Sequence, residues 1–235
     1  MSEESAATLP PELTPVIAVD GPSGSGKGTL ARLIAEHFGW HLLDSGALYR
    51  IIGCVADKLG LDSADAIGLA TMAGGLQISF ADEQVRVSHA DRQWVLTDEI
   101  RTEEAGVQAS VVAALPEVRT AVLALLHSFR QAPGLVADGR DMGTVVFPDA
   151  QLKIFLDASA EERAQRRYKQ LKNKGLSVSL RGLLEQIRER DARDRGRAVA
   201  PLKPAADALV IDSTNMTIEA VLQQVLAEAG QLGIS

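Results

Sequence analysis

The sequence predicts an α/β fold with a doubly wound, five-stranded parallel sheet, helices on both faces of that sheet, and a small antiparallel β insert. Five short apolar runs that each end in aspartate alternate with stretches of helical periodicity, which is typical of a parallel sheet. A glycine-rich turn joins the first run to the first helical stretch. Near the middle of the chain, apolar and polar residues alternate with period two, which indicates antiparallel strands.

The first part of the chain contains two predicted strands and two predicted helices. Residues 16–20 are mostly apolar and precede the glycine-rich turn, so we expect a buried strand there. Apolar residues recur at helical spacing over 29–38, and Gly39 ends this helix. Residues 41–44 form the second predicted strand, and a helix follows over 47–60.

The period-two segment predicts an inserted subdomain. Residues 76–80 alternate between apolar and polar, and the short apolar runs 85–87 and 94–96 flank a polar turn at 89–92. This pattern indicates an antiparallel meander of two or three strands. We expect Trp94 to form part of the small core of the insert rather than a platform for stacking bases.

The second half of the chain returns to the α/β pattern. Helical periodicity resumes near Thr102 and again over 117–129. Three further strands are predicted at 135–138, 152–157 and 208–212, with a long basic helical stretch between the last two. Because parallel strands end at one edge of their sheet, we expect ligands to bind at the carboxyl ends of these strands.

The composition is that of a globular protein with an aliphatic core. The chain has 235 residues, of which 46% are hydrophobic and only 4% aromatic. Cys54 is the single cysteine, so we expect a core thiol in a cytoplasmic protein rather than a disulfide scaffold. Residues 1–15 are polar and proline-marked, which predicts a disordered tail and not a signal peptide. No run of about 18 apolar residues predicts a membrane span, and we expect a monomer.

Charge is distributed unevenly along the chain. The net charge is −7, yet residues 163–203 contain thirteen lysines and arginines against four acidic residues. Bound phosphates would explain such a segment, and a solvated helical face is the alternative. A nucleic-acid-binding protein is a third interpretation of the charge. We expect no nucleic-acid partner, because Tyr168 is the only aromatic residue in the segment and no nucleic-acid-binding motif is present.

The glycine-rich turn matches the phosphate-binding loop G-x-x-x-x-G-K, and it lies between a predicted strand and a predicted helix. Glycines let backbone N–H groups face an anion, the helix N-terminus adds positive charge, and Lys27 can reach the β- and γ-phosphates of a nucleotide. The hydroxyl that can meet Mg²⁺ comes one place late, because Gly28 follows the lysine and Thr29 follows the glycine. The expected nucleotide-binding residues are Gly21, Pro22, Ser23, Gly24, Ser25, Gly26, Lys27, Gly28 and Thr29.

Four later motifs carry a family resemblance. D-S-G-A-L-Y-R occupies 44–50, A-D-G-R-D-M-G occupies 137–143, a further motif occupies 153–159, and R-D-A-R-D-R-G-R occupies 190–197. In this order, and together with the G-K-G-T loop, they resemble the bacterial cytidylate kinase family over about 16–229.

The resemblance implies a P-loop kinase that uses ATP with Mg²⁺ and phosphorylates CMP or dCMP. It also implies a lid and an extra β-domain in the acceptor region, where the antiparallel insert falls. We therefore expect four parts in the chain. They are a tail at 1–15, a nucleotide-binding core at 16–61, 130–160 and 198–235, an acceptor-binding region at 62–129, and a lid with basic helices at 161–197.

For the acceptor phosphate, the resemblance points to basic residues. It implies that Ser45 and Arg50 line the acceptor pocket, with Arg50 on the phosphate. It further implies that Arg140 and Arg197 hold the phosphate of CMP. Together with Lys27 of the loop, Arg140 and Arg197 are the expected catalytic residues.

For the nucleoside, the resemblance implies polar contacts. It places Asp141 at the acceptor nucleotide, Arg190 and Asp194 on the ribose, and Ser110 and Arg119 at the edge of the cytosine ring. These residues complete the expected acceptor site.

Spacing and residue type support part of this site and leave alternatives open. Arg190, Asp194 and Arg197 are four and three residues apart, so they share one face of a predicted helix, although a surface ion-pair network has the same spacing. Asp138 and Asp141 bracket the end of a strand, where Mg²⁺ contact, substrate contact and a simple turn are all compatible with aspartate. No histidine or cysteine has metal-ligand spacing. Another acceptor, such as UMP, AMP or shikimate, and a nucleotide-binding scaffold without turnover are the competing interpretations.

Overall fold

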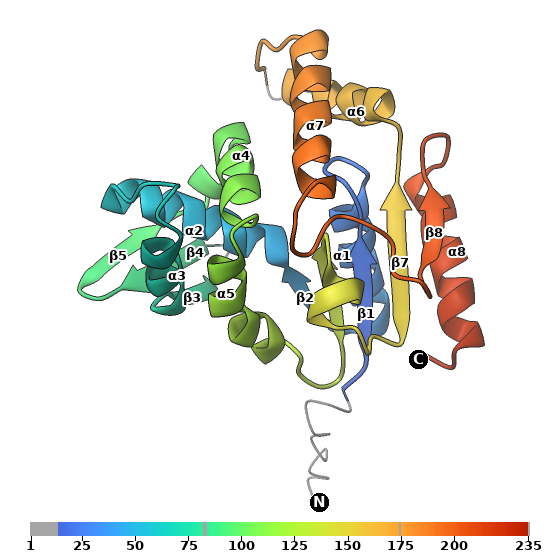
Figure 1. The fold of residues 1–235 in the computed structure, drawn as a ribbon. Helices are drawn as coiled ribbons and strands as arrows, with labels where there is room; N and C mark the ends of the chain where they lie inside the picture. Colours follow the sequence, from blue (N-terminus) through green and yellow to red (C-terminus); the bar gives the residue numbers. More distant parts are fainter. Residues whose placement is uncertain (1–13, 82–83, 174, 235) are drawn as a thin grey trace, which may run out of the picture.

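The computed structural model describes residues 14–81, 84–173 and 175–234. It contains a five-stranded parallel sheet in the order β2-β6-β1-β7-β8 and a separate three-stranded antiparallel sheet (Figure 1). The predicted fold class is therefore confirmed. The elements of the main sheet and the helices that follow its strands are β1 (Val16–Asp20), α1 (Lys27–Phe38), β2 (His41–Asp44), α2 (Ser45–Leu59), β6 (Leu135–Gly139), β7 (Leu152–Asp157), β8 (Leu209–Asp212) and α8 (Ile218–Gln231).

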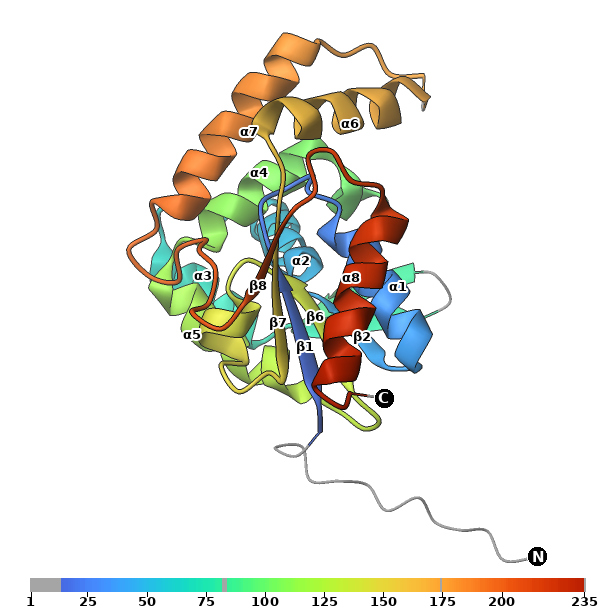
Figure 2. The ribbon, with the colours of Figure 1, turned by 90° about the vertical axis from the view of Figure 1, so that its right-hand side faces the viewer.

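Alternation along β1 explains why helices cover both faces of the sheet. All five of its residues are buried, because neighbouring strands flank it and helices pack on each side. Val16 and Ala18 pack into the core formed with α2, whereas Ile17 and Val19 pack into the core formed with α1 and α8. Figure 2 shows α1 and α8 side by side on that second face.

The acceptor-side segment between α2 and β6 contains more helix than the sequence pattern predicts. The helix at Ala66–Gly74 was not predicted, because it consists almost entirely of apolar and small residues, which leave no period to detect. Its start is nevertheless encoded locally, since the Asp65 carboxylate accepts a hydrogen bond from the Gly68 amide at 2.9 Å. The elements here are α3 (Ala66–Gly74), β3 (Gln77–Ala81), β4 (Gln84–His89), β5 (Arg92–Val95), the 3₁₀ turn η2 (Glu99–Arg101), α4 (Glu103–Val112) and α5 (Pro116–Ser128).

Several predicted boundaries shift by a few residues in the structure. The turn between β4 and β5 is shorter than the predicted polar turn, because the strands extend to His89 and resume at Arg92. Trp94 is partly buried, as predicted for a core residue, and it packs against the hydrophobic core that the antiparallel strands share with α2, α3 and α5. Cys54 is buried, also as predicted.

The expected tail lies mostly outside the described residues, which begin at Thr14. Thr14 itself is fully buried, and its carbonyl accepts a hydrogen bond from Arg130 Nε at 2.8 Å. The fold therefore starts slightly before the predicted boundary at residue 15.

Two helices stand over the carboxyl ends of the parallel strands, in the basic segment (Figures 1 and 2). They are α6 (Ala160–Asn173) and α7 (Leu180–Arg195), and a π-helical turn, η3 (Met142–Val146), follows β6 at the same edge. No single helix in the described part of the chain is long and apolar enough to span a membrane, although α4 and α5 together pass that test across a bend of 103°.

Close packing at Gly134 provides a test of the core. A Cβ atom at this buried position would lie 2.2 Å from Cδ2 of the Trp40 indole, a ring that cannot give way inside the core. We expect Gly134→Ala to lower the free energy of unfolding by about 1–3 kcal/mol through overpacking. Gly74→Ala is the matched control, since a Cβ atom there would have no neighbouring atom within 4 Å. Urea denaturation of both variants checks this, and equal stability of the two would contradict the packing at Trp40.

Candidate active site

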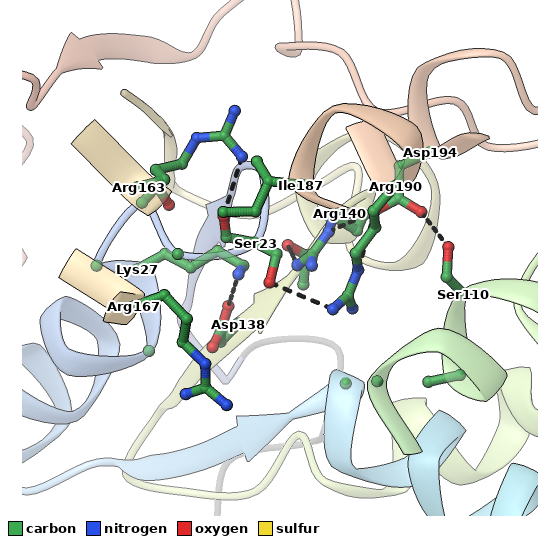
Figure 3. Close-up of a pocket in the computed structure, with 18 of the residues that line it drawn as sticks. Ser23, Lys27, Ser110, Asp138, Arg140, Arg163, Arg167, Ile187, Arg190 and Asp194 are labelled. Carbon is green, nitrogen blue, oxygen red and sulfur yellow. Dashed lines mark hydrogen bonds and ion pairs between the residues drawn. The ribbon is translucent and has the colours of Figure 1, made fainter. Parts of the chain in front are cut away.

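A cavity of about 850 Å³ opens at the carboxyl edge of the main sheet, below α6 and α7. Every residue that the sequence analysis singled out for nucleotide binding or catalysis lines it, except Gly21 and Pro22, which are buried at the start of the loop. Figure 3 shows side chains from the loop, β6, α4, α6 and α7 converging on this space. The fold therefore brings together residues that are far apart in the chain, such as Ser23 and Arg190, which are 167 positions apart.

The glycine-rich loop joins β1 to α1 in a conformation that only glycine adopts without strain. Gly26 is the N-cap of α1 and has a φ of 97°, in the left-handed region. At Gly21 a Cβ atom would lie 2.1 Å from the carbonyl oxygen of Leu156. Only glycine at position 21 therefore lets the loop lie this close to β7. The loop and the first turn of α1, including Thr29, line the cavity. Backbone N–H groups at such a helix N-terminus form an anion-binding site.

Lys27 adds a positively charged side chain to the backbone donors of the loop. Its ammonium lies 3.8 Å from Asp138 Oδ1 and donates a hydrogen bond to the Pro22 carbonyl at 3.4 Å. Burial, together with the positive charge of Arg140, lowers the pKa of Lys27 to about 8, although Asp138 opposes the shift. Burial likewise raises the pKa of Asp138 to about 6, against the attraction of Lys27. The site therefore holds a desolvated lysine whose charge an anion would stabilise.

A second group of basic side chains surrounds the carboxylate of Asp194. Arg197 Nη2 lies 2.6 Å from Oδ1, Arg140 Nε lies 3.1 Å from Oδ2, and Arg190 Nε lies 4.0 Å from Oδ2. Ser110 Oγ donates to Oδ1 at 2.8 Å. Burial alone would raise the pKa of Asp194, but the three guanidinium groups and this hydroxyl lower it below its usual value.

Three arginines of the cavity have side-chain N–H donors without a hydrogen-bond partner among the described residues. Within the described residues, the buried Nε atoms of Arg50, Arg190 and Arg197 have no hydrogen-bond partner. Burial and the charge of Arg140 lower the pKa of Arg190 to about 10. Unpaired buried donors are costly, so their presence indicates a site prepared for an anion that accepts several hydrogen bonds.

The far wall of the cavity pairs Arg119 with Asp141. Arg119 Nη2 forms an ion pair with Asp141 Oδ2, and its guanidinium lies 5.9 Å from the ring centroid of Tyr49. Burial raises the pKa of Asp141 although Arg119 is adjacent, and burial raises the pKa of Tyr49 to about 12. Ser110 lies on α4 and Arg119 on α5, two helices that meet at Pro116.

One expectation about side-chain placement is corrected by the structure. Arg197 does not share a helical face with Asp194, because α7 ends at Arg195 and Gly196 caps it; the loop that follows brings Arg197 back to the carboxylate. Asp194 is only 1% exposed, so the cluster is no surface ion-pair network. Ser45 reaches the cavity, but its hydroxyl donates to the Asp138 carbonyl at 2.8 Å.

Three arginines of α6 were missed by the sequence analysis. Arg163 Nη1 donates to the Ser23 carbonyl at 3.0 Å, and Arg166 Nη1 donates to the Ser25 carbonyl at 3.1 Å, so both contact the glycine-rich loop. Arg167 points into the cavity and pairs with Glu103 of α4 (Figure 3). Their three- and four-residue spacing within the basic segment was the available signal, because it places them on one helical face.

The cavity offers oxygen atoms that could hold Mg²⁺ together with the phosphates of a nucleotide. Across the described residues, no group of three or more His, Cys, Asp or Glu side chains could hold a metal ion. Asp138 Oδ1 is buried and accepts no hydrogen bond there, and the Thr29 hydroxyl lines the same space. This donor set fits Mg²⁺, which takes oxygen ligands and usually keeps water and substrate phosphates in its coordination shell.

Comparison with known proteins agrees with this geometry. The chain matches the family model described as cytidylate kinase over residues 17–231. A cytidylate kinase of Aeromonas salmonicida (strain A449) is 58% identical over 223 residues, which cover 94% of this chain and 96% of that protein. One of Pseudomonas paraeruginosa (strain DSM 24068 / PA7) is 57% identical over 225 residues, covering 93% of this chain and 96% of its own.

Solved structures were compared as well. Shikimate kinase from Acinetobacter baumannii in complex with shikimate aligns with 96% of this chain and 100% of its own, at a TM-score of 0.42 and 18% identity. The family model and the sequence relatives each span nearly all of the described fold. The chain therefore belongs to the cytidylate kinase family and is a phosphotransferase.

Proposed function

We propose that this chain transfers the γ-phosphoryl group of ATP to the phosphate of CMP or dCMP, with release of ADP and CDP or dCDP. The observation that carries the proposal is that the glycine-rich loop with Lys27 and the arginines around Asp194 face one cavity. An oxygen of the acceptor phosphate attacks the γ-phosphorus, and the bond from that phosphorus to the oxygen bridging the β- and γ-phosphates breaks. Family membership supports a nucleotide as the acceptor.

The loop side of the cavity suits the donor nucleotide. Backbone N–H groups of the loop and the ammonium of Lys27 would hold the β- and γ-phosphates. Arg163 and Arg166 brace the loop through the Ser23 and Ser25 carbonyls. Asp138 and Thr29 would hold Mg²⁺, which when bound would neutralise charge on the phosphates.

The arginine side suits the phosphate of the acceptor. Arg50, Arg140 and Arg197 present guanidinium groups to the cavity, and the unused Nε donors of Arg50 and Arg197 would find acceptors in phosphate oxygens. Because the second pKa of a phosphate monoester is about 6, the acceptor is already ionised near neutral pH and needs no strong general base. Catalysis then depends on orientation and on stabilising charge in the transition state.

The nucleoside of the acceptor would extend toward the walls made by α4, α5 and α7. We assign its sugar to Arg190 and Asp194, and its base to Ser110 and Arg119, with Asp141 holding Arg119 in place. Ser110 and Asp194 are hydrogen-bonded to each other, so the sugar and base contacts belong to one connected network.

We further propose that residues 161–197 act as a lid over the two phosphates. The lid helices line the cavity, contact the glycine-rich loop, and contribute Arg163, Arg167 and Arg190 to the cavity wall. Closure of such a lid excludes water, which would otherwise accept the phosphoryl group. The parallel sheet serves as the core, and residues 62–129 as the acceptor-binding region.

The reaction itself is the first test of this proposal. With ATP and Mg²⁺, we expect CMP to be converted to CDP at a kcat/KM at least about 10² higher than for UMP or AMP, because a site that satisfies the cytosine edge leaves buried groups unpaired against other bases. Coupled ADP release and chromatographic detection of CDP measure this. Preferred turnover of AMP or UMP would assign the site to another acceptor.

The shifted pKa of Lys27 gives a test of the donor side. With a pKa of about 8, this amine is mostly uncharged in the free protein at pH 9, and nearby phosphates would raise its pKa by charge pairing. ATP binding at pH 9 should therefore take up roughly 0.5–1 proton, which calorimetry in buffers of different ionisation enthalpy detects. Lys27→Met should abolish the uptake and lower kcat about 10²–10³-fold with the fold intact. Unchanged proton uptake in this variant would remove Lys27 from the phosphate site.

Arg119 gives a test of base recognition. We expect Arg119→Ala to raise the KM for CMP about tenfold or more and to narrow the ratio of kcat/KM between CMP and UMP, because one charged hydrogen-bond donor to the base is lost. The KM for ATP should stay within about twofold. Arg181→Ala is the control, since Arg181 is exposed on α7, where it pairs with Glu185 of the same helix. An equal loss for both acceptors would place Arg119 on the sugar or phosphate instead.

A further inference from the structure

Asp20 is a buried carboxylate that the proposed mechanism leaves without a role. It is the last residue of β1 and directly precedes Gly21 of the glycine-rich loop, yet it does not line the cavity. Only 5% of the residue is exposed. A buried carboxylate is expensive unless it accepts several hydrogen bonds, so its partners should reveal what it does.

Both carboxylate oxygens of Asp20 accept hydrogen bonds from backbone amides that lie shortly after Arg140 in the chain. Oδ1 accepts from the Met142 amide at 2.8 Å, and Oδ2 accepts from the Gly143 amide at 2.8 Å. These amides begin the π-helical turn η3, where the first N–H groups have no partner within the turn itself. One carboxylate therefore satisfies two of those donors.

The turn is placed so that a shift in it would move the site. In the parallel register, Asp20 pairs with Gly139, and the two residues between Gly139 and η3 are Arg140 and Asp141. The backbone at Gly139 is tightly packed, because a Cβ atom there would lie 2.7 Å from Met142 Cγ and 2.7 Å from Ser45 Oγ. The hydrogen bonds that Asp20 accepts from Met142 and Gly143 thus hold one end of a short segment whose other end is fixed in the sheet.

That short segment carries both sides of the acceptor pocket. Arg140 Nε contacts the Asp194 carboxylate at 3.1 Å, and Asp141 pairs with Arg119. Asp20 directly precedes Gly21 in the chain. Its side chain therefore connects the start of the glycine-rich loop with the segment that carries Arg140 and Asp141.

We infer that Asp20 is a positioning residue for phosphoryl transfer, which aligns Arg140 and Asp141 with the donor loop by holding the amides of Met142 and Gly143. This role needs a carboxylate, since two N–H donors must be accepted by two oxygens. Burial, with the nearby charges of Asp141 and Asp138 adding to it, raises the pKa of Asp20 to about 7, although the two amide hydrogen bonds oppose this. The protein thus retains a costly group at this position.

The main test replaces the carboxylate by an amide of the same shape. In Asp20→Asn, one oxygen can still accept, but the NH₂ group faces the second backbone N–H and cannot. We expect the KM for CMP to rise about tenfold, with the KM for ATP unchanged within about twofold, after rates are normalised to active enzyme. Asp212→Asn is the matched control, because Asp212 also ends a parallel strand and accepts from a following amide, that of Thr214, but is exposed and, within the described part of the chain, does not contact the segment between β6 and η3.

A double variant tests whether Asp20 acts through Arg140. If it does, adding Asp20→Asn to the Arg140→Ala variant should raise the KM for CMP by no more than about twofold over Arg140→Ala alone. The group that Asp20 positions is already absent from that variant. Full additivity of the two losses, or equal increases in the KM values for ATP and CMP, would overturn the inference. Should Asp20→Asn fail to fold, Asp20→Ser is used in both experiments, since its smaller hydroxyl fits the space and still accepts one hydrogen bond.

Because these assays depend on the proposed CMP phosphorylation, a measurement without substrate is added. Hydrogen exchange at the amides of Met142 and Gly143 should be at least about tenfold faster in Asp20→Asn than in the wild type, while Asp212→Asn leaves it unchanged. Absence of CMP turnover in the wild type would refute the proposed function only. Unchanged exchange at both amides would refute the role of Asp20, whatever the acceptor is.

Discussion

The carboxylate of Asp194 allows the site to exist before any substrate arrives. Arg140, Arg190 and Arg197 lie within 4.0 Å of it, and the guanidinium groups repel one another, since, besides burial, the charge of Arg140 helps to lower the pKa values of Arg190 and Arg197. A single buried counter-charge offsets part of that repulsion and orients the guanidinium groups. The cluster as a whole remains positive, so the free protein already provides what an incoming phosphate requires.

This arrangement explains why the chain needs no chemically reactive side chain for phosphoryl transfer. Donor and acceptor phosphates are both anions, and their approach is the main obstacle. In the proposed reaction, the glycine-rich loop with Lys27 would neutralise the donor phosphates, and Arg50, Arg140 and Arg197 would neutralise the phosphate of the acceptor. Because these groups are fixed before the reaction, little reorganisation is required in the transition state. Asp20, through the amides of η3, connects the two halves.

Helices α6 and α7, the proposed lid, contact both halves as well. Arg163 forms a buried ion pair with Asp191, which joins α6 to α7, and also donates to the Ser23 carbonyl of the loop. Arg190 of α7 donates to Ser23 Oγ and lies beside Asp194. Movement of these helices would therefore alter the phosphate loop and the acceptor cluster together, which is what a lid that excludes water must do.

Local sequence patterns alone were enough for the fold class and the phosphate loop, because strand alternation, helix periodicity and the glycines of a tight turn act over a few positions. The family resemblance supplied the residues expected at the acceptor site. Folding alone decided that Asp194 is buried, that Arg197 returns to it from beyond the end of α7, and that Asp20 reaches the amides of η3. The partners of these side chains lie as much as 123 positions away along the chain. Such contacts leave no periodic trace in the sequence, since they depend on strand register and helix packing, which are set only when the sheet assembles.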